Sequence, residues 1–251
     1  MGALPHIRRS VSLGLLVLLL GACTTTSNTN NAPLQPEIAT GYTRKADVVT
    51  QKFAVAAANP LATQAGFDIL KAGGSAVDAA IAVQMVLGLV EPQSSGLGGG
   101  AFLLHSAAGE GANKVQAFDG RETAPAAATE DMLLSADGKP LAFHVAVVGG
   151  RSVGTPGVLR MLAQAHAQHG KLPWAKLFEP AIELATQGFA ISPRLHAQLK
   201  VDAYLRLDAS ARAYFYQANG EPHAVGHVLR NPELAAVLQR IATEGVQAFY
   251  S

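Results

Sequence analysis

Hydrophobic residues recur at helical spacing in the segment that follows Asn59. Apolar positions repeat every four residues from Leu61 to Leu70, and Asn59 and Pro60 ahead of them favour the first turn of a helix. Gly73 is placed to end this helix in a left-handed conformation. The pattern therefore predicts a helix between Pro60 and the glycine pair.

The next segment is apolar on every side. Ser75 and Asp78 have the spacing of a capping box, and from Ala79 to Val90 the only polar side chain is Gln84. A surface helix would show a polar face, so this helix belongs in the interior of a layered domain.

Short apolar runs flank these two helices. Phe53 to Ala58 predicts a short buried strand, and Ala101–Ser106 with Lys114–Asp119 predicts a buried antiparallel hairpin. Beyond residue 152 the pattern is mainly helical, with Trp174 expected as a core anchor. An interior helix beside such strands is typical of a layered domain.

A glycine-rich run lies between the apolar helix and the hairpin. Gly96, Gly98 and Ala101 match a dinucleotide-binding fingerprint, but that fingerprint follows a strand and opens a helix, and the order here is reversed. We expect instead a turn whose glycines permit positive φ and a close backbone approach. Either a small ligand or a tight helix-to-strand connection would require such a turn.

Arg121 stands where the second hairpin strand leaves the sheet. It is either a solvated rim charge paired with Asp119 or Glu122, or a binding residue. A guanidinium fork holds a carboxylate in two parallel hydrogen bonds, which lysine cannot copy. By itself the local sequence leaves both interpretations open.

Five longer segments follow one another in a recognisable order. They are NPLATQAGFDILKAGGSAVDAAIAVQMVLGLVEPQSSGLGGGAFLL, FDGRETAPAAATEDML, SVGTPGVL, GKLPWAKLFEPAIELATQGFAISPRL and IATEGVQAFY. Together they resemble the N-terminal part of the γ-glutamyltransferase family, also called γ-glutamyltranspeptidase or glutathione hydrolase. The resemblance covers nearly everything from Phe53 to the C-terminus.

The resemblance implies an N-terminal-nucleophile hydrolase fold, an αββα sandwich, made as a zymogen that cleaves itself into a large and a small subunit. The new N-terminal threonine of the small subunit attacks glutathione or another γ-glutamyl donor, and water or an amino acid then takes the acyl group. No cofactor and no metal are implied. The arginine of the family's R-E-x-A-P motif falls on Arg121, which by resemblance binds the donor α-carboxylate.

The family's threonine nucleophile matches no position of this chain. We therefore expect an incomplete sandwich that stops within the large subunit, has no catalytic residue of its own, lacks its small-subunit partner and is inactive alone. One alternative is a related β-lactam acylase-like hydrolase of the same fold. Another is a non-catalytic envelope lipoprotein that keeps the fold as a binding module.

Charge and histidine spacing argue against two other classes of site. The chain has 19 basic and 18 acidic residues, a balance that does not favour nucleic acid. His166 and His169 are spaced like a ligand pair, but no third ligand is evident, so we interpret them as surface histidines rather than a metal site.

The N-terminus has the pattern of a lipoprotein signal. Residues 1–22 combine a basic stub with an apolar core that is shorter than the roughly twenty residues needed to span a bilayer. Cys23, the single cysteine, stands in a lipoprotein-type cleavage box and would carry the lipid. Residues 23–50 would form a disordered tether and residues 51–251 the domain. The expected location is the periplasmic side of a bacterial envelope, at the outer membrane, because Asp does not follow the cysteine.

The lipid anchor gives a direct prediction. Cys23→Ser should abolish incorporation of labelled palmitate into the chain expressed in a bacterium, because the thiol is the acylated atom. The label should be followed in the purified protein, and its persistence in the variant would refute the anchor.

Overall fold

The computed structural model describes residues 46–107 and 114–251, which belong to one compact unit that runs from Thr40 to Ser251. The predicted signal peptide, Cys23 and most of the predicted tether lie outside the described residues. Residues 46–50 of the tether are exposed and have no regular secondary structure.

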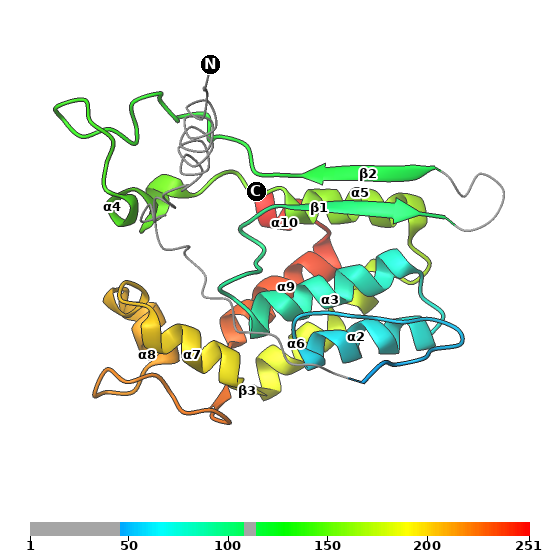
Figure 1. The fold of residues 1–251 in the computed structure, drawn as a ribbon. Helices are drawn as coiled ribbons and strands as arrows, with labels where there is room; N and C mark the ends of the chain where they lie inside the picture. Colours follow the sequence, from blue (N-terminus) through cyan, green and yellow to red (C-terminus); the bar gives the residue numbers. More distant parts are fainter. Residues whose placement is uncertain (1–45, 108–113) are drawn as a thin grey trace, which may run out of the picture. The chain divides into compact units, whose positions relative to one another are not determined.

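The described residues form a mixed arrangement of helices and two small sheets (Figure 1). The α-helices are α2 (Pro60–Lys71), α3 (Ala76–Val90), α4 (Phe143–Val147), α5 (Val158–His169), α6 (Glu179–Gln187), α7 (Pro193–Val201), α8 (Ala209–Phe215), α9 (Pro232–Glu244) and α10 (Gln247–Tyr250). Short 3₁₀ helices are η1 (Gly150–Ser152), η2 (Trp174–Leu177) and η3 (Leu205–Leu207). The antiparallel pairs are β1 (Ala101–Ser106) with β2 (Val115–Gly120), and β3 (Phe189–Ala190) with β4 (Val228–Leu229).

The predicted starts of α2 and α3 are confirmed. The Asn59 side chain accepts a hydrogen bond from the backbone N–H of Leu61, and Ser75 and Asp78 form both bonds of a capping box. Gly73 has a φ of 94°, which is the left-handed stop expected after α2.

Helix α3 is the centre of the core. It contacts α2, α5, α6 and η2, and its residues Ile81, Met85 and Val86 are almost completely buried. Each such side chain contributes roughly 1.5–3 kcal/mol when it leaves water. These contacts explain the apolar character of most of α3, but the helix is not buried on every side, because Ala76 and Ala80 are exposed.

Asp78 links the N-terminal end of α3 to the loop after α5 through hydrogen bonds. Its carboxylate is fully buried, and Oδ2 accepts hydrogen bonds from the backbone N–H groups of Ser75 (2.8 Å), Lys171 (2.9 Å) and Leu172 (3.1 Å). The other oxygen, Oδ1, lies 3.6 Å from Nε2 of His166. One side chain thus joins segments that are more than ninety residues apart in the sequence.

Glu91 plays a similar part at the C-terminal end of α3. Its carboxylate is 2% exposed and accepts hydrogen bonds from the side-chain amides of Asn59 (2.9 Å) and Gln93 (2.7 Å). Nε of Arg194 lies 3.5 Å from the same carboxylate. The start of α2, the end of α3 and the start of α7 therefore meet at one buried charge.

The helices of the second half agree with the sequence pattern, with one difference. Trp174 is a core anchor, as predicted, because Nε1 donates to the carbonyl of Ile241 at 3.1 Å and the ring lies 4.8 Å from that of Phe178. The helix expected from Trp174 onward is divided into η2 and α6. Pro180 has no N–H to continue the earlier turn, and it suits the first turn of a new helix.

The prediction of a buried strand at Phe53–Ala58 is wrong. Its side chains alternate between half-buried and exposed, as in a strand, but this segment pairs with no other strand within residues 46–107 and 114–251. Phe53 instead packs against Phe67 of α2, with ring centroids 5.3 Å apart. An extended backbone becomes a strand only when a neighbour completes the hydrogen bonds.

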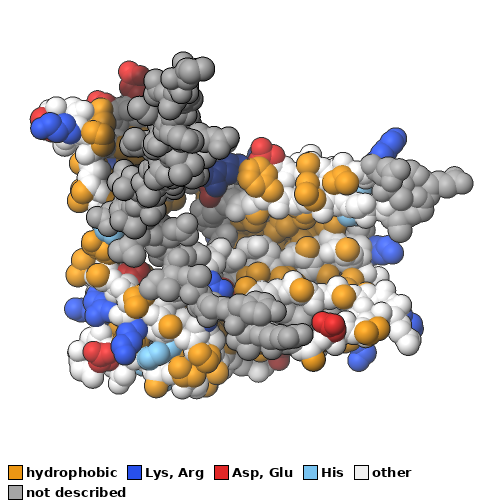
Figure 2. Space-filling view, viewed as in Figure 1, with side chains coloured by type: hydrophobic (Ala, Val, Ile, Leu, Met, Phe, Trp, Pro, Cys, Tyr) orange, Lys and Arg blue, Asp and Glu red, His pale blue; other side chains and the backbone are white. Residues whose placement is uncertain are grey.

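The β1–β2 hairpin is confirmed, but only one of its faces is buried. Phe118 faces α5 and is buried, whereas Phe102 and Leu104 on the other face are 68% and 73% exposed. Val115 is exposed on that face too, and Figure 2 shows hydrophobic side chains gathered along the hairpin. We call Phe102, Leu104 and Val115 the outer hairpin face.

The bonds of Asp78 predict a large effect on stability. Asp78→Ala should lower the free energy of unfolding by about 3 kcal/mol, because three backbone N–H groups lose a charged acceptor. Asp68→Ala is the matched control, since Asp68 is exposed on α2 and its carboxylate accepts a single side-chain hydrogen bond, from Gln64, among the described residues, and it should change stability by less than about 0.5 kcal/mol. Urea unfolding followed by Trp174 fluorescence measures both, and equal effects would contradict the assigned role.

Candidate functional site

Three segments that are distant in the sequence converge beside the end of β2. They are the turn 92–100, the strand exit 119–123 and the stretch 152–157. The carbonyl of Gly99 accepts from the N–H groups of Gly157 (3.1 Å) and Val158 (3.3 Å), which ties the turn to the start of α5. Thr123 and Thr155 exchange backbone hydrogen bonds of 3.3 and 2.8 Å. The strand exit is therefore held between the other two segments.

The glycines of these segments provide space rather than unusual backbone angles. A Cβ on Gly100 would lie 2.5 Å from Oε2 of Glu122 and 2.6 Å from the carbonyl of Gly120, and one on Gly157 would lie 2.4 Å from that same carbonyl. The predicted close backbone approach is thus present. The predicted positive φ is wrong for this run, because no glycine from Gly96 to Gly100 has one. Close packing, rather than a positive φ, therefore requires glycine at residue 100.

Arg121 lies directly after β2 with its side chain in solvent. Its backbone N–H donates to Oδ1 of Asp119 at 2.9 Å, and its side chain is 71% exposed. Nη1 lies 3.3 Å from Oε2 of Glu122, so of the two partners expected for the guanidinium the structure selects Glu122. Most of the guanidinium fork remains free to meet a ligand.

Glu122 is the residue that sequence reasoning undervalued. It was expected only as an ion-pair partner, yet its carboxylate lines a cavity of about 470 Å³ under the glycine turn. Its Oε2 is shielded from water and accepts no hydrogen bond from a described residue. The signal was present in the sequence, since this glutamate follows Arg121 directly in the R-E-x-A-P motif.

The cavity beside Glu122 has a lining of both polar and apolar groups. Its wall consists of Gln84, Pro92, Ser94, Ser95, Gly96, Gly98, Gly99, Gly100, Ala101 and Glu122. Backbone groups, two hydroxyls and one carboxylate can therefore reach a small polar molecule there. We take this cavity, together with Arg121 beside it, as the candidate site.

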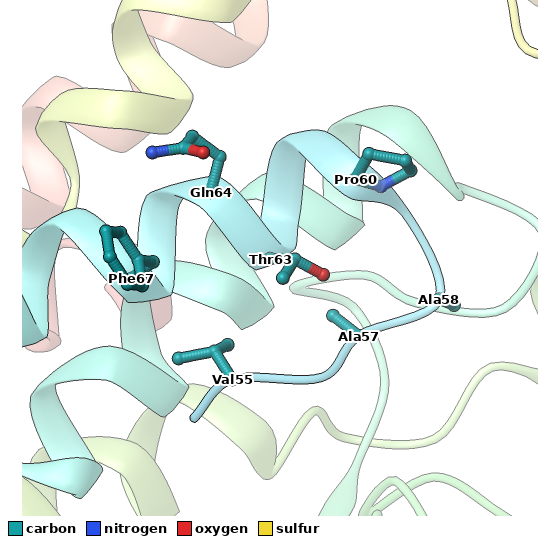
Figure 3. A pocket seen from close by; sticks show the side chains of 7 residues that line it. All are labelled: Val55, Ala57, Ala58, Pro60, Thr63, Gln64 and Phe67. Carbon is teal, nitrogen blue, oxygen red and sulfur yellow. The ribbon is translucent and has the colours of Figure 1, made fainter. Parts of the chain in front are cut away.

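A second cavity, of about 510 Å³, lies between segment 53–58 and α2 (Figure 3). It is lined by Val55, Ala57, Ala58, Pro60, Thr63, Gln64 and Phe67. Its two polar side chains already have partners, because Thr63 donates to the carbonyl of Asn59 and Gln64 donates to Asp68. It carries no charged group and is a weaker candidate for binding an amino acid.

The two histidines considered as metal ligands have separate partners. Nε2 of His166 lies 2.9 Å from the carbonyl of Leu172, and Nε2 of His169 lies 2.7 Å from Oε1 of Gln116. Within the described part of the chain, no three His, Cys, Asp or Glu side chains are grouped to hold a metal ion. Nor does any helix in that part have the length and apolar character needed to cross a membrane.

Comparison with known proteins places these features in a family. The family model described as gamma-glutamyltranspeptidase matches residues 62–251. A relative from Bacillus subtilis, named glutathione hydrolase proenzyme, is 40% identical over 197 residues, which cover 78% of this chain and 33% of the relative. The chain spans about a third of the length of the curated relatives that it matches first.

Solved structures give the same result. The gamma-glutamyltranspeptidase of Helicobacter pylori matches with a TM-score of 0.76 at 30% identity, over 82% of this chain and 58% of that one. A cephalosporin acylase from Bacillus halodurans matches with a TM-score of 0.70 at 33% identity, over 86% and 40%. The predicted α/β fold of N-terminal-nucleophile hydrolase type is confirmed, and the described residues make up part of it.

The packing at Gly100 gives a prediction for the site. Gly100→Ala should lower the free energy of unfolding by about 1–3 kcal/mol, because its Cβ collides with a carboxylate and a backbone carbonyl. Gly98→Ala should change it by no more than about 0.5 kcal/mol, since nothing lies within 4 Å of the added Cβ and φ is not positive. Urea unfolding of the two variants tests the difference, and a tolerated Gly100→Ala would mean that the turn does not depend on this close contact.

Proposed function

The chain belongs to the gamma-glutamyltranspeptidase family, and we propose that it supplies the donor-recognition part of an enzyme that cleaves γ-glutamyl compounds. The observation that carries the proposal is the exposed guanidinium of Arg121 beside the polar cavity of the glycine turn. The names of its relatives as glutathione hydrolases support the choice of glutathione or a similar donor.

Arg121 binds the α-carboxylate of the donor in this proposal. A γ-glutamyl compound presents a free α-carboxylate at the end away from the bond that is cleaved. A guanidinium in solvent retains several N–H donors and forms two parallel bonds to a carboxylate. Holding that end fixes the position of the γ-carbonyl for attack.

The reaction would proceed through a covalent γ-glutamyl ester. The hydroxyl of an N-terminal threonine attacks the γ-carbonyl carbon, the bond to the donor nitrogen breaks, and the amine leaves with a proton. Water then hydrolyses the ester, or an amino acid accepts the glutamyl group. We place the attacking threonine in polypeptide outside these 251 residues, because no threonine here stands in the cleavage context of the family.

The partner in this proposal is the small subunit made from the same precursor. Two observations support it: the chain spans about a third of its curated relatives, and several of these are named proenzymes. The outer hairpin face offers a docking surface, since exposed apolar sheet surface of this kind marks an interaction site. We propose that the small subunit packs against Phe102, Leu104 and Val115.

Two alternatives find less support. The cephalosporin acylase is similar in structure, but the matching family model describes gamma-glutamyltranspeptidases, and Arg121 suits an amino-acid carboxylate. A non-catalytic binding module would keep the cavity and need no partner.

We also propose that the chain is held at the periplasmic side of a bacterial envelope through Cys23, on the sequence pattern alone.

Replacement of Arg121 tests the function. In the enzyme that contains the small subunit, Arg121→Lys should raise the KM for a γ-glutamyl anilide about ten- to hundredfold, because the two-bond contact with the carboxylate is lost. Self-cleavage of the precursor should continue, since that chemistry lies elsewhere. Initial rates of amine release give the KM, and gel analysis shows the cleavage.

Two controls accompany this measurement. Arg212→Lys changes an exposed arginine on α8 in the same way and should leave the KM unchanged. The 251-residue chain alone should release no amine. An unchanged KM in Arg121→Lys would reject the role of Arg121, and turnover by the chain alone would show that the nucleophile lies within it.

A further inference from the structure

We propose that Glu122 is a positioning residue that fixes the guanidinium of Arg121 beside the cavity. The proposal deepens the function given above and rests on it for the ligand, but the ion pair itself can be measured without any ligand. It starts from a feature that the function does not yet explain, a Glu122 carboxylate oxygen that is shielded from water and accepts no hydrogen bond from residues 46–107 or 114–251.

Glycines on two segments hold the Glu122 side chain in place. A Cβ on Gly100 would lie 2.5 Å from Oε2, and one on Gly154 would lie 2.8 Å from Cβ of Glu122. A Cβ on Gly99 would lie 3.6 Å from Oε1, which is ordinary contact. The Glu122 side chain therefore fills space that side chains at residues 100 and 154 would otherwise take, and it has little freedom to turn.

The backbone on either side of the pair is also fixed. The N–H of Arg121 is bonded to Oδ1 of Asp119, and Thr123 is bonded in both directions to Thr155. Glu122 and Arg121 thus leave a rigid strand exit as neighbouring side chains. Only the long side chain of the arginine remains to be ordered.

The negative charge of Glu122 orders the Arg121 side chain. A carboxylate oxygen removed from water is costly unless a cation lies close to it. Nη1 of Arg121 is 3.3 Å away, and the Glu122 side chain is 27% exposed against 71% for Arg121. The less exposed and more confined partner therefore determines where the more exposed one rests.

The pair leaves the arginine able to bind. A guanidinium carries five N–H donors in a planar fork, so contact at Nη1 leaves others for a carboxylate. Fixing the fork before the ligand arrives reduces the entropy lost on binding, which strengthens binding without a new contact. Loss of Glu122 should then weaken donor binding while the chemical step stays intact.

The first experiment observes Arg121 without a ligand. In the 251-residue chain labelled with ¹⁵N and ¹³C in arginine, NMR measures rotation about the Cζ–Nη1 bond, and the Arg121 signal is assigned by its loss in Arg121→Lys. Glu122→Gln should speed this rotation at least threefold. Glu130→Gln is the matched control, because Glu130 is an exposed glutamate in the connection between β2 and α4, and it should have no effect. Unchanged rotation in Glu122→Gln would overturn the proposal.

The second experiment measures the consequence for the donor. In the enzyme with its small subunit, Glu122→Gln should raise the donor KM roughly tenfold and change kcat less than twofold, whereas Glu130→Gln should change neither. Glu122→Asp keeps the charge on a shorter side chain and should fall between the two, which retains a test if Glu122→Gln folds poorly. A fall in kcat with an unchanged KM would overturn the positioning role.

The two experiments separate this inference from the function on which it rests. If Arg121→Lys leaves the KM unchanged while Glu122→Gln still speeds the rotation, carboxylate recognition by Arg121 is refuted and the ion pair stands. If Arg121→Lys raises the KM and Glu122→Gln alters neither rotation nor KM, recognition stands and the role of Glu122 is refuted.

Discussion

The burial of α3 along most of its surface organises this structure. A helix without a polar face packs against other elements, and α3 contacts α2, α5, α6 and η2, while Ala76 and Ala80 remain exposed. Enclosure leaves the ends of the helix as the places where polar groups must be satisfied. Asp78 does this at one end through three backbone N–H groups, and Glu91 does it at the other through Asn59 and Gln93. Because Glu91 directly precedes the glycine turn, the order of the core extends to the border of the candidate site.

At the candidate site, the space left by Gly100 and the charge of Glu122 act together. Gly100 has no side chain of its own, and this lets the carboxylate of Glu122 lie against the backbone. A carboxylate fixed in this way attracts the neighbouring Arg121, which is otherwise in solvent. The glycines and the acid therefore lie deeper than the arginine, whose side chain is 71% exposed against 27% for Glu122.

The outer hairpin face and segment 53–58 show the same physical situation at two places. Each has the geometry of a sheet element, and each lacks a neighbour among the described residues that would complete it. The curated relatives are about three times as long as the matched region, so the family has further polypeptide available for these surfaces.

Much of this fold could be predicted from the sequence because it depends on local interactions. Asn59 and Ser75 begin helices through bonds to residues two or three positions away, and Gly73 ends one, so a short window holds all the information. The same holds for the β1–β2 hairpin, whose strands are close in the chain. Arg121 could be selected because its motif is contiguous. Segment 53–58 could not be assigned correctly, because a strand is defined by a partner that its own residues do not specify. The place of Glu122 in the cavity, and the reason for glycine at residue 100, were decided only by tertiary structure, since both depend on contacts between residues at least twenty positions apart.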